Sequence, residues 1–187
     1  KITAEQQLAV DNLDALDAQT KLSVRMFGED IKRWEEGNKF RHHGFEITQM
    51  GGVHNDLPAF LINIHRVDSV TDAEAYLSRL KKIDKVFEQT IVNLKKSEAI
   101  GVLPPHFTFK YVTDDLKNFI AGCDKTDGSN VLLNDFSAKV DALATDKSVK
   151  GMLKAQAAET IRTTVKNSYQ QLLDYWTALE PKAAANG

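Results

Sequence analysis

Histidine is the residue type in this sequence that is best suited to bind a metal ion or to move protons near neutral pH. Four of the five histidines, His42, His43, His54 and His65, lie in one stretch of the chain. Two metal ligands on one helix face stand three or four residues apart, as in H-E-x-x-H, whereas these are adjacent or more than ten positions apart. We therefore predict loop histidines and no metal site. A small metalloenzyme that uses His42, His43 and His54 is kept as a minor alternative.

The candidate nucleophiles lack the surroundings that would activate them. Cys123 ends an apolar stripe, where a thiol behaves as a small hydrophobic side chain with an unactivated pKa. None of the serines lies in a G-x-S-x-G motif. Gly51 and Gly52 are not followed by the lysine and hydroxyl residue of a phosphate-binding loop. The sequence therefore predicts no catalytic residue.

The composition excludes several classes of protein. The chain has 187 residues, of which 42% are hydrophobic and 27% charged, so it can bury a core and fold. Its net charge is -2 and neither sign forms a long run, which argues against a nucleic-acid partner. No apolar stretch reaches transmembrane length, so we expect no membrane insertion by this chain. The single cysteine leaves the compartment undecided.

Most of the chain shows apolar residues at every third or fourth position, which predicts helices. Capping-box pairs mark two of the expected starts, Thr3 with Gln6 and Thr71 with Glu74. Phe107, Phe109 and Tyr111 alternate as a strand would, but the residues that follow favour a helix. The expected helices cover residues 3–37, 57–65, 71–99, 107–120, 131–143 and 158–179, the last ended by Pro181.

These segments predict an all-α fold. A helix over 71–99 would be roughly 43 Å long, which favours an elongated bundle of long antiparallel helices with their apolar stripes inward. Residues 39–70 form an irregular connection that contains glycines and histidines. We predict a single helical domain over residues 1–187.

An ordered series of short motifs runs through the chain: Gln49-Met50-x-Gly52, His54, Leu57-Pro58, Thr71-x-Ala73-Glu74-x-Tyr76-Leu77-x-Arg79-Leu80 and Gly101-x-Leu103-Pro104-Pro105. In order and spacing, this series resembles the family called domain of unknown function 885. Tyr169, Leu173 and Pro181-Lys182-Ala183 also resemble the helix that leads out of the family's N-terminal part. The likeness covers most of the chain.

The resemblance implies a longer bacterial protein that is similar to helical zinc metallopeptidases, and many family members are envelope lipoproteins. The family's metal site lies in its later half, where a His-Glu pair and further histidines supply the ligands and the general base, and nothing here matches it. The chain is therefore expected to be the N-terminal fragment of such a protein, without hydrolase activity or a cofactor of its own. Zinc would be bound in the missing C-terminal part. That part and a peptide substrate are the expected partners, and the expected location is the envelope or periplasm, with a lipid anchor upstream.

Four residues of the irregular segment are candidates for lining a cleft: Gly52, His54, Asn55 and Pro58. Irregular backbone with polar side chains often presents binding groups, although a tight turn that caps two helices explains the same residues. The leading prediction is a non-catalytic helical part that contributes scaffold and one wall of a substrate groove. The alternative is a self-sufficient helical module that binds another protein.

Overall fold

The computed structural model describes residues 13–125 and 128–184. Within these residues the regular structure is helical, apart from an isolated bridge between Thr48 and Gly51. The predicted all-α class is therefore confirmed. The chain divides into two compact units, Lys1–His43 and Gly44–Gly187.

The first unit contains a 3-10 turn, η1 (Leu13–Ala15), and the helix α2 (Ala18–Gly37). The helix begins at Ala18 because Asp17 caps it: the Asp17 carboxylate accepts hydrogen bonds of 2.9 Å from the Thr20 amide and 2.7 Å from the Thr20 hydroxyl. The prediction of an unbroken helix is therefore wrong for residues 13–37. The proposed capping pair, Thr3 and Gln6, lies outside the described residues.

The predicted end of α2 at Gly37 is confirmed. Gly37 has a right-handed φ of -68°, so it does not supply the left-handed conformation that often ends a helix. The chain instead tightens into the 3-10 turn η2 (Asn38–Phe40). This turn satisfies carbonyl groups at the helix end, because the Asn38 amide bonds back to Glu35 and Trp34.

The second unit begins with a segment that is less irregular than expected. Residues 39–70 include the helix α3 (Val53–Asn63), which starts four residues before the predicted helix. Gly52 precedes it with a φ of 135°, and a Cβ there would lie 2.9 Å from the Glu46 carbonyl oxygen. Glycine is therefore the residue that lets the chain turn into α3 at this point.

The predicted helix over 71–99 is two helices, α4 (Val70–Leu80) and α5 (Ile83–Ala99). A tight turn at Lys81 and Lys82 separates them, and it carries no glycine or proline that could signal the break. The apolar spacing continues through the turn because Leu80 and Ile83 are both buried. The predicted Thr71 and Glu74 capping box is also wrong, since the Ser69 hydroxyl accepts from the Asp72 amide and is the N-cap.

The next two helices match their predictions. The first residues of α6 (Phe107–Cys123) are helical, so the alternative of a strand there is wrong. The helix α7 (Val131–Asp141) follows a polar turn. Asn130 holds that turn in place: its side chain accepts from the Leu133 amide at 3.0 Å and donates to the Cys123 carbonyl at 3.2 Å. The end of α6 is thereby fixed to the start of α7.

The last element is longer than predicted. The helix α8 (Lys147–Thr160) continues through a π-helical turn, η3 (Ile161–Val165), into α9 (Lys166–Ala184). Pro181 lies inside α9 and does not end it, contrary to the prediction. The carbonyl that loses its helical partner to this proline belongs to Thr177, an exposed residue, so water can hydrate it.

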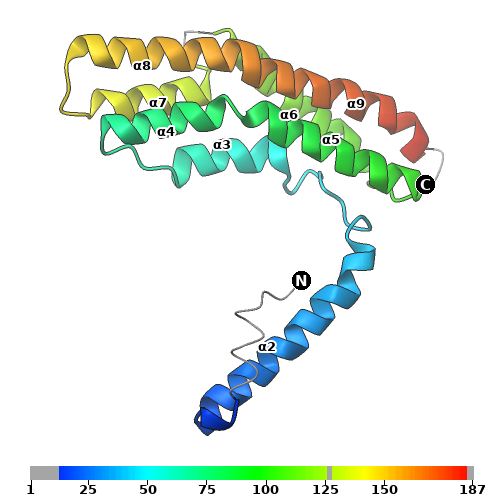
Figure 1. Cartoon of the computed structure of the whole chain (residues 1–187). Helices are drawn as coiled ribbons and strands as arrows, with labels where there is room; N and C mark the ends of the chain where they lie inside the picture. Colours follow the sequence, from blue (N-terminus) through cyan, green and yellow to red (C-terminus); the bar gives the residue numbers. More distant parts are fainter. Residues whose placement is uncertain (1–12, 126–127, 185–187) are drawn as a thin grey trace. The chain divides into compact units, whose positions relative to one another are not determined.

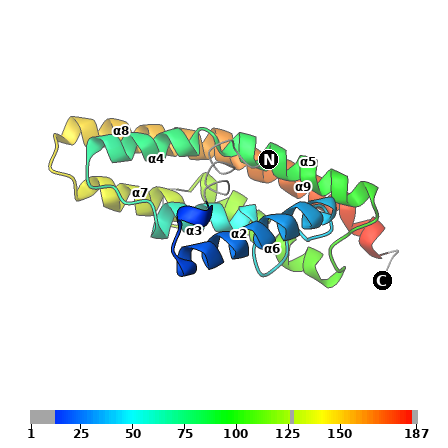
Figure 2. The ribbon, with the colours of Figure 1, turned by 60° about the horizontal axis from the view of Figure 1, so that its bottom comes forward.

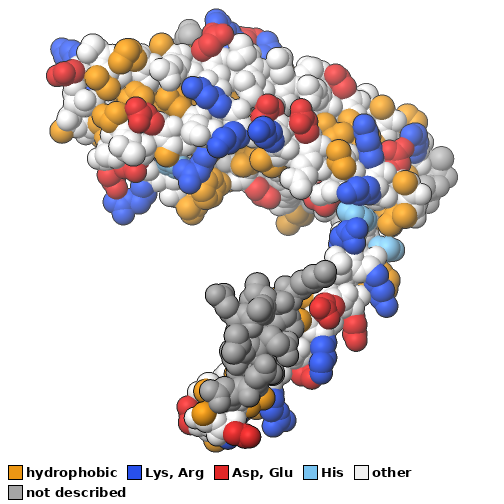
Figure 3. Space-filling view, in the orientation of Figure 1, with side chains coloured by type: hydrophobic (Ala, Val, Ile, Leu, Met, Phe, Trp, Pro, Cys, Tyr) orange, Lys and Arg blue, Asp and Glu red, His pale blue; other side chains and the backbone are white. Residues whose placement is uncertain are grey.

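The helices α4, α5, α6 and α7 pack lengthwise around the rod formed by α8, η3 and α9, and α3 packs on α7 and α5. The α8 half contacts α4 and α7, and the α9 half contacts α5 and α6 (Figures 1 and 2). Trp176 anchors the α9 half: it is fully buried, stacks on Phe109 at 4.4 Å and donates its indole N–H to the Phe109 carbonyl. On the face of this unit in Figure 3, acidic and basic side chains are interspersed.

Candidate functional site

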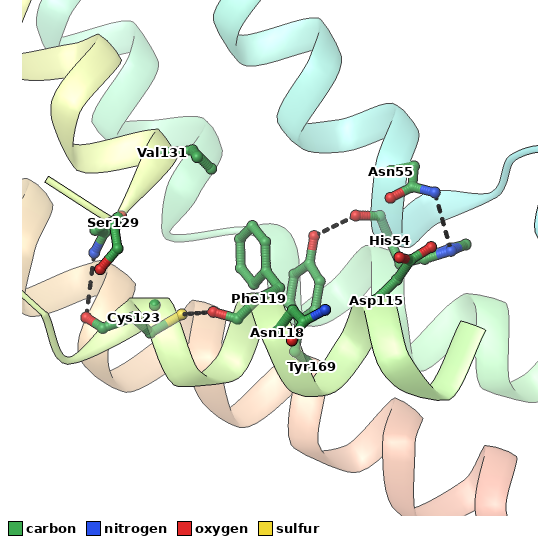
Figure 4. Close-up of a pocket in the computed structure, with 11 residues that line it drawn as sticks. His54, Asn55, Asp115, Asn118, Phe119, Cys123, Ser129, Val131 and Tyr169 are labelled. Carbon is green, nitrogen blue, oxygen red and sulfur yellow. Dashed lines mark hydrogen bonds between the residues drawn. The ribbon is translucent and has the colours of Figure 1, made fainter. Parts of the chain in front are cut away.

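A cavity of about 260 Å³ lies in the second unit, where α3, α6, α9 and the residues before α7 meet (Figure 4). Its lining combines polar side chains with apolar ones, among them the rings of Phe119 and Tyr169. All of these elements belong to one compact unit. The lining residues are His54, Asn55, Asp115, Asn118, Phe119, Gly122, Cys123, Ser129, Asn130, Val131 and Tyr169.

The first turn of α3 places His54 at the inner side of the cavity. Its side chain is only 2% exposed. Its backbone carbonyl would normally accept from the amide four residues later, but that residue is Pro58, which has no N–H. The Tyr169 hydroxyl takes this place and donates to the His54 carbonyl at 2.6 Å (Figure 4). Proline and tyrosine together thus fix α3 against α9.

One hydrogen bond of the His54 ring assigns its tautomer. The Asn55 side-chain nitrogen lies 3.2 Å from Nε2, and because an amide nitrogen only donates, Nε2 must accept. The proton of the neutral ring is therefore on Nδ1, which is buried and has no hydrogen-bond partner among the described residues. Burial lowers the pKa of His54 below its ordinary value of 6.5, against the opposite influence of the Asp115 and Asp56 carboxylates. The ring is neutral at pH 7.

The opposite wall comes from one face of α6. Asp115, Asn118 and Gly122 are spaced by three and four residues, so they share a side of the helix. Asp115 is exposed and lines the same cavity as His54 (Figure 4). Gly122 allows the Ser129 backbone to approach, since a Cβ there would lie 3.0 Å from the Ser129 carbonyl oxygen. This wall therefore combines a carboxylate, an amide and closely packed backbone.

The groups of the cavity that could act as nucleophiles hold their protons firmly. The rings of Phe119 and Tyr169 stack at 3.9 Å, and burial raises the pKa of Tyr169 well above its ordinary value. The Cys123 thiol donates to the Phe119 carbonyl at 3.3 Å, and burial raises its pKa to about 11. At neutral pH the cavity therefore presents hydrogen-bonding groups and one carboxylate.

The family of this protein follows from its sequence. The family model described as bacterial protein of unknown function, DUF885, matches residues 2–187. The chain belongs to the DUF885 family. This confirms the resemblance in the motif series, whereas the metallopeptidase-like and lipoprotein properties stay predictions.

The fold of this DUF885 chain also occurs in a solved structure described as the putative lipoprotein from Colwellia psychrerythraea. The two share 23% sequence identity with a TM-score of 0.70, and the match covers 74% of this chain. The chain spans only 23% of the length of that structure. None of the curated proteins matches the sequence. No helix in the described part of the chain is long and apolar enough to cross a bilayer.

The four candidate cleft residues take different positions in this DUF885 chain. His54 and Asn55 line the cavity. Gly52 and Pro58 do not line it, but they set the backbone that carries His54, through the turn before α3 and the carbonyl left free for Tyr169. Whether these residues face a cleft of a longer protein stays a prediction.

His42, His43 and His65 are not among the residues that line the cavity. His42 and His43 belong to the first unit, and within the described residues no three His, Cys, Asp or Glu side chains gather closely enough to bind a metal. Asp115, Asn118 and Tyr169 were not predicted as site residues. The spacing of Asp115, Asn118 and Gly122 was a usable signal for a polar helix face, but nothing in the sequence pairs that face with α3.

Proposed function

We propose that this DUF885 chain is the non-catalytic helical part of an envelope-associated, peptidase-like protein, and that it supplies scaffold and one wall of a substrate groove. The observation that carries the proposal is the cavity beside His54. There, polar side chains of α3 and α6 surround the stacked rings of Phe119 and Tyr169 on a frame of packed helices. Rigid elements that present a few polar groups around apolar surface are typical of binding sites.

The chemistry of the cavity favours binding over bond cleavage. The His54 ring is bonded to an amide rather than to a hydroxyl or thiol, so it has no nucleophile to activate in this arrangement. The high pKa of the Cys123 thiol, about 11, keeps it protonated at neutral pH. The proposal therefore places the zinc and the reacting groups of the peptidase-like protein outside residues 1–187.

The proposed location rests on the solved structure with the same fold. That protein is described as a lipoprotein, and it is much longer than this chain, which spans 23% of it. A longer envelope protein with an upstream lipid anchor agrees with this likeness. In such a protein the partners of this chain are the rest of the same polypeptide and a peptide substrate.

The test is a peptidase assay on the intact protein that contains this chain. We expect the intact protein to hydrolyse peptides in a zinc-dependent manner and residues 1–187 alone to hydrolyse none. Mass spectrometry of a peptide mixture measures the hydrolysis. Asn118→Ala removes one hydrogen-bonding group from the wall and should raise KM about three- to tenfold with little change in kcat. Lys117→Ala is the matched control, because Lys117 is exposed on the same helix and does not line the cavity.

Three results would contradict the proposal. Hydrolysis by residues 1–187 alone would show that the chain is catalytic. An intact protein that hydrolyses no peptide would not be peptidase-like. An unchanged KM for Asn118→Ala would show that this face of α6 is not a wall of the substrate groove. The self-sufficient interaction module would then become the better hypothesis.

A further inference from the structure

The ring of His54 has an unused hydrogen-bond donor. Nδ1 carries the proton, is buried, and finds no acceptor among the described residues. A buried donor without a partner destabilises the folded protein, and such groups in folded proteins call for an explanation such as a ligand or a bound water. His54 lines the cavity, so a ligand there could supply the missing acceptor once a local shift of the ring or of Asn55 exposes Nδ1.

The charge of the cavity restricts the kind of ligand. Asp115 is the lining residue with a formal charge at neutral pH, and neither lysine nor arginine is among the described lining residues. An anionic ligand would meet an uncompensated carboxylate, whereas a cation would form a charge-assisted hydrogen bond with it. The ligand should therefore combine a positive group for Asp115 with a neutral oxygen acceptor for His54.

The size of the cavity restricts the ligand further. A volume of about 260 Å³ is slightly below the range of about 300–1,000 Å³ that encloses drug-sized molecules, so it admits the end of a chain better than its middle. Tyr111 precedes Asp115 by one turn on the same face of α6 and is 56% exposed. Its ring offers a contact to whatever leaves the cavity on that side.

We propose that this cavity binds the amino-terminal residue of a peptide, with the terminal ammonium at the Asp115 carboxylate and the first carbonyl oxygen at Nδ1 of His54. The α-ammonium and the carbonyl of one residue supply the cation and the neutral acceptor together. This inference rests on the proposed function, because it names the ligand of the same cavity. Solvent does not reach Nδ1 in the free protein, so binding includes a small shift of His54 or of the exposed Asn55.

The binding test uses trialanine amide and its N-acetylated form, which lacks the ammonium. Isothermal titration calorimetry on the protein should show that acetylation weakens binding at least about tenfold. Asp115→Asn should weaken binding of the free-amine peptide by a similar factor. Asp114→Asn is the matched control, because Asp114 is exposed on the same helix, pairs with Lys110 and does not line the cavity. It should leave the affinity unchanged.

The role of His54 is read without a mutation, by NMR of its ring nitrogens in ¹⁵N-labelled protein. The free protein should show the Nδ1–H tautomer, and the Nδ1 proton should shift downfield when trialanine amide binds. An Nε2–H tautomer, equal affinity for the two peptides, no binding of either, or an unaffected Asp115→Asn variant would each overturn the inference. Zinc-dependent hydrolysis of peptides with blocked amino termini by the intact protein would leave the proposed function in place while this inference fails.

Discussion

The Tyr169 hydroxyl donates a 2.6 Å hydrogen bond to the backbone carbonyl of His54, across 115 residues of sequence. That carbonyl is available because Pro58 supplies no amide to it. The bond joins α9 to the first turn of α3 and so fixes one wall of the cavity. Both residues are buried, which makes the bond sensitive to the loss of either group.

Removing the Tyr169 hydroxyl should destabilise the protein. Tyr169→Phe leaves a buried carbonyl without a donor, and we expect a loss of about 1–3 kcal/mol in the free energy of unfolding, measured with urea. Tyr111→Phe is the control, since Tyr111 is exposed and its variant should stay within about 0.5 kcal/mol of the wild type. Equal losses in the two variants would show that the bond to His54 contributes nothing.

The proline that frees the carbonyl should couple energetically to the tyrosine. In Pro58→Ala the new backbone N–H can donate to the His54 carbonyl, so the tyrosine hydroxyl is no longer its single donor. We expect Tyr169→Phe to lower stability by about 1 kcal/mol less in the Pro58→Ala background than in the wild type, as measured by a double-mutant cycle. Strict additivity of the two substitutions would contradict this explanation.

The burial of His54 predicts a pH dependence of stability. Its pKa is lower in the folded protein than the ordinary 6.5, so below about pH 6.5 the unfolded chain binds a proton that the folded chain does not. The free energy of unfolding should therefore decrease as the pH falls from 7 through 6.5 towards the folded pKa. Urea unfolding between pH 7.5 and 5.5 measures the slope. An NMR titration of the His54 ring checks its source, and a midpoint at or above 6.5 would refute it.

The ammonium group of Lys139 links α7 to the end of α3 and should contribute strongly to stability. It donates to the carbonyls of Leu61 and Ile62 at 2.9 and 2.8 Å, and pairs with Asp135 at 2.8 Å. The Lys139 and Asp135 side chains are only 20% and 19% exposed, so Lys139→Met would leave a largely buried carboxylate unpaired. We expect a loss of about 3 kcal/mol in the free energy of unfolding.

A surface pair of the same spacing controls for this effect. Lys110 and Asp114 are also four residues apart on a helix, but their side chains are 78% and 51% exposed. Lys110→Met should change stability by less than about 0.5 kcal/mol. If both lysine variants lose the same stability, burial is not the reason for the effect at Lys139.

The backbone at Gly52 should tolerate no side chain. Its φ of 135° is strained for other residues, and an added Cβ would meet the Glu46 carbonyl at 2.9 Å, so Gly52→Ala should destabilise by at least about 2 kcal/mol. Gly101 also has a positive φ, 78°, but with open space around it. Gly101→Ala should lower stability by only about 1 kcal/mol in the same urea experiment. A smaller loss at Gly52 than at Gly101 would argue against the close contact.

Most helices could be predicted because their buried residues follow the helical period without interruption. The breaks between helices could not be predicted. The turn at Lys81 keeps Leu80 and Ile83 on the buried side, so the apolar period continues through it. At the start of α2, local capping by Asp17 competes with the longer apolar pattern. In the cavity, His54 stood out as a polar residue in an irregular segment. Tyr169 did not, because its apolar ring fits the stripe of its helix.

The sequence also could not predict which helices come together to form the cavity. Asp115 reads as one more charged residue on a solvated helix face, and only the packing of α6 beside α3 brings it to His54. Local patterns predict which face of a helix is polar, but not which other element that face meets. A site assembled from three separate helices therefore requires the tertiary structure.

The π-helical turn at Ile161–Val165 has a consequence for the whole rod. A turn that holds one extra residue rotates everything beyond it by about 100° relative to a regular helix. The side of the rod that is buried therefore changes its direction at this turn. This suits a single rod that packs on α4 and α7 along the α8 half and on α5 and α6 along the α9 half. Deleting one residue from this turn would restore regular helical winding and twist one half of the rod out of register with its neighbours.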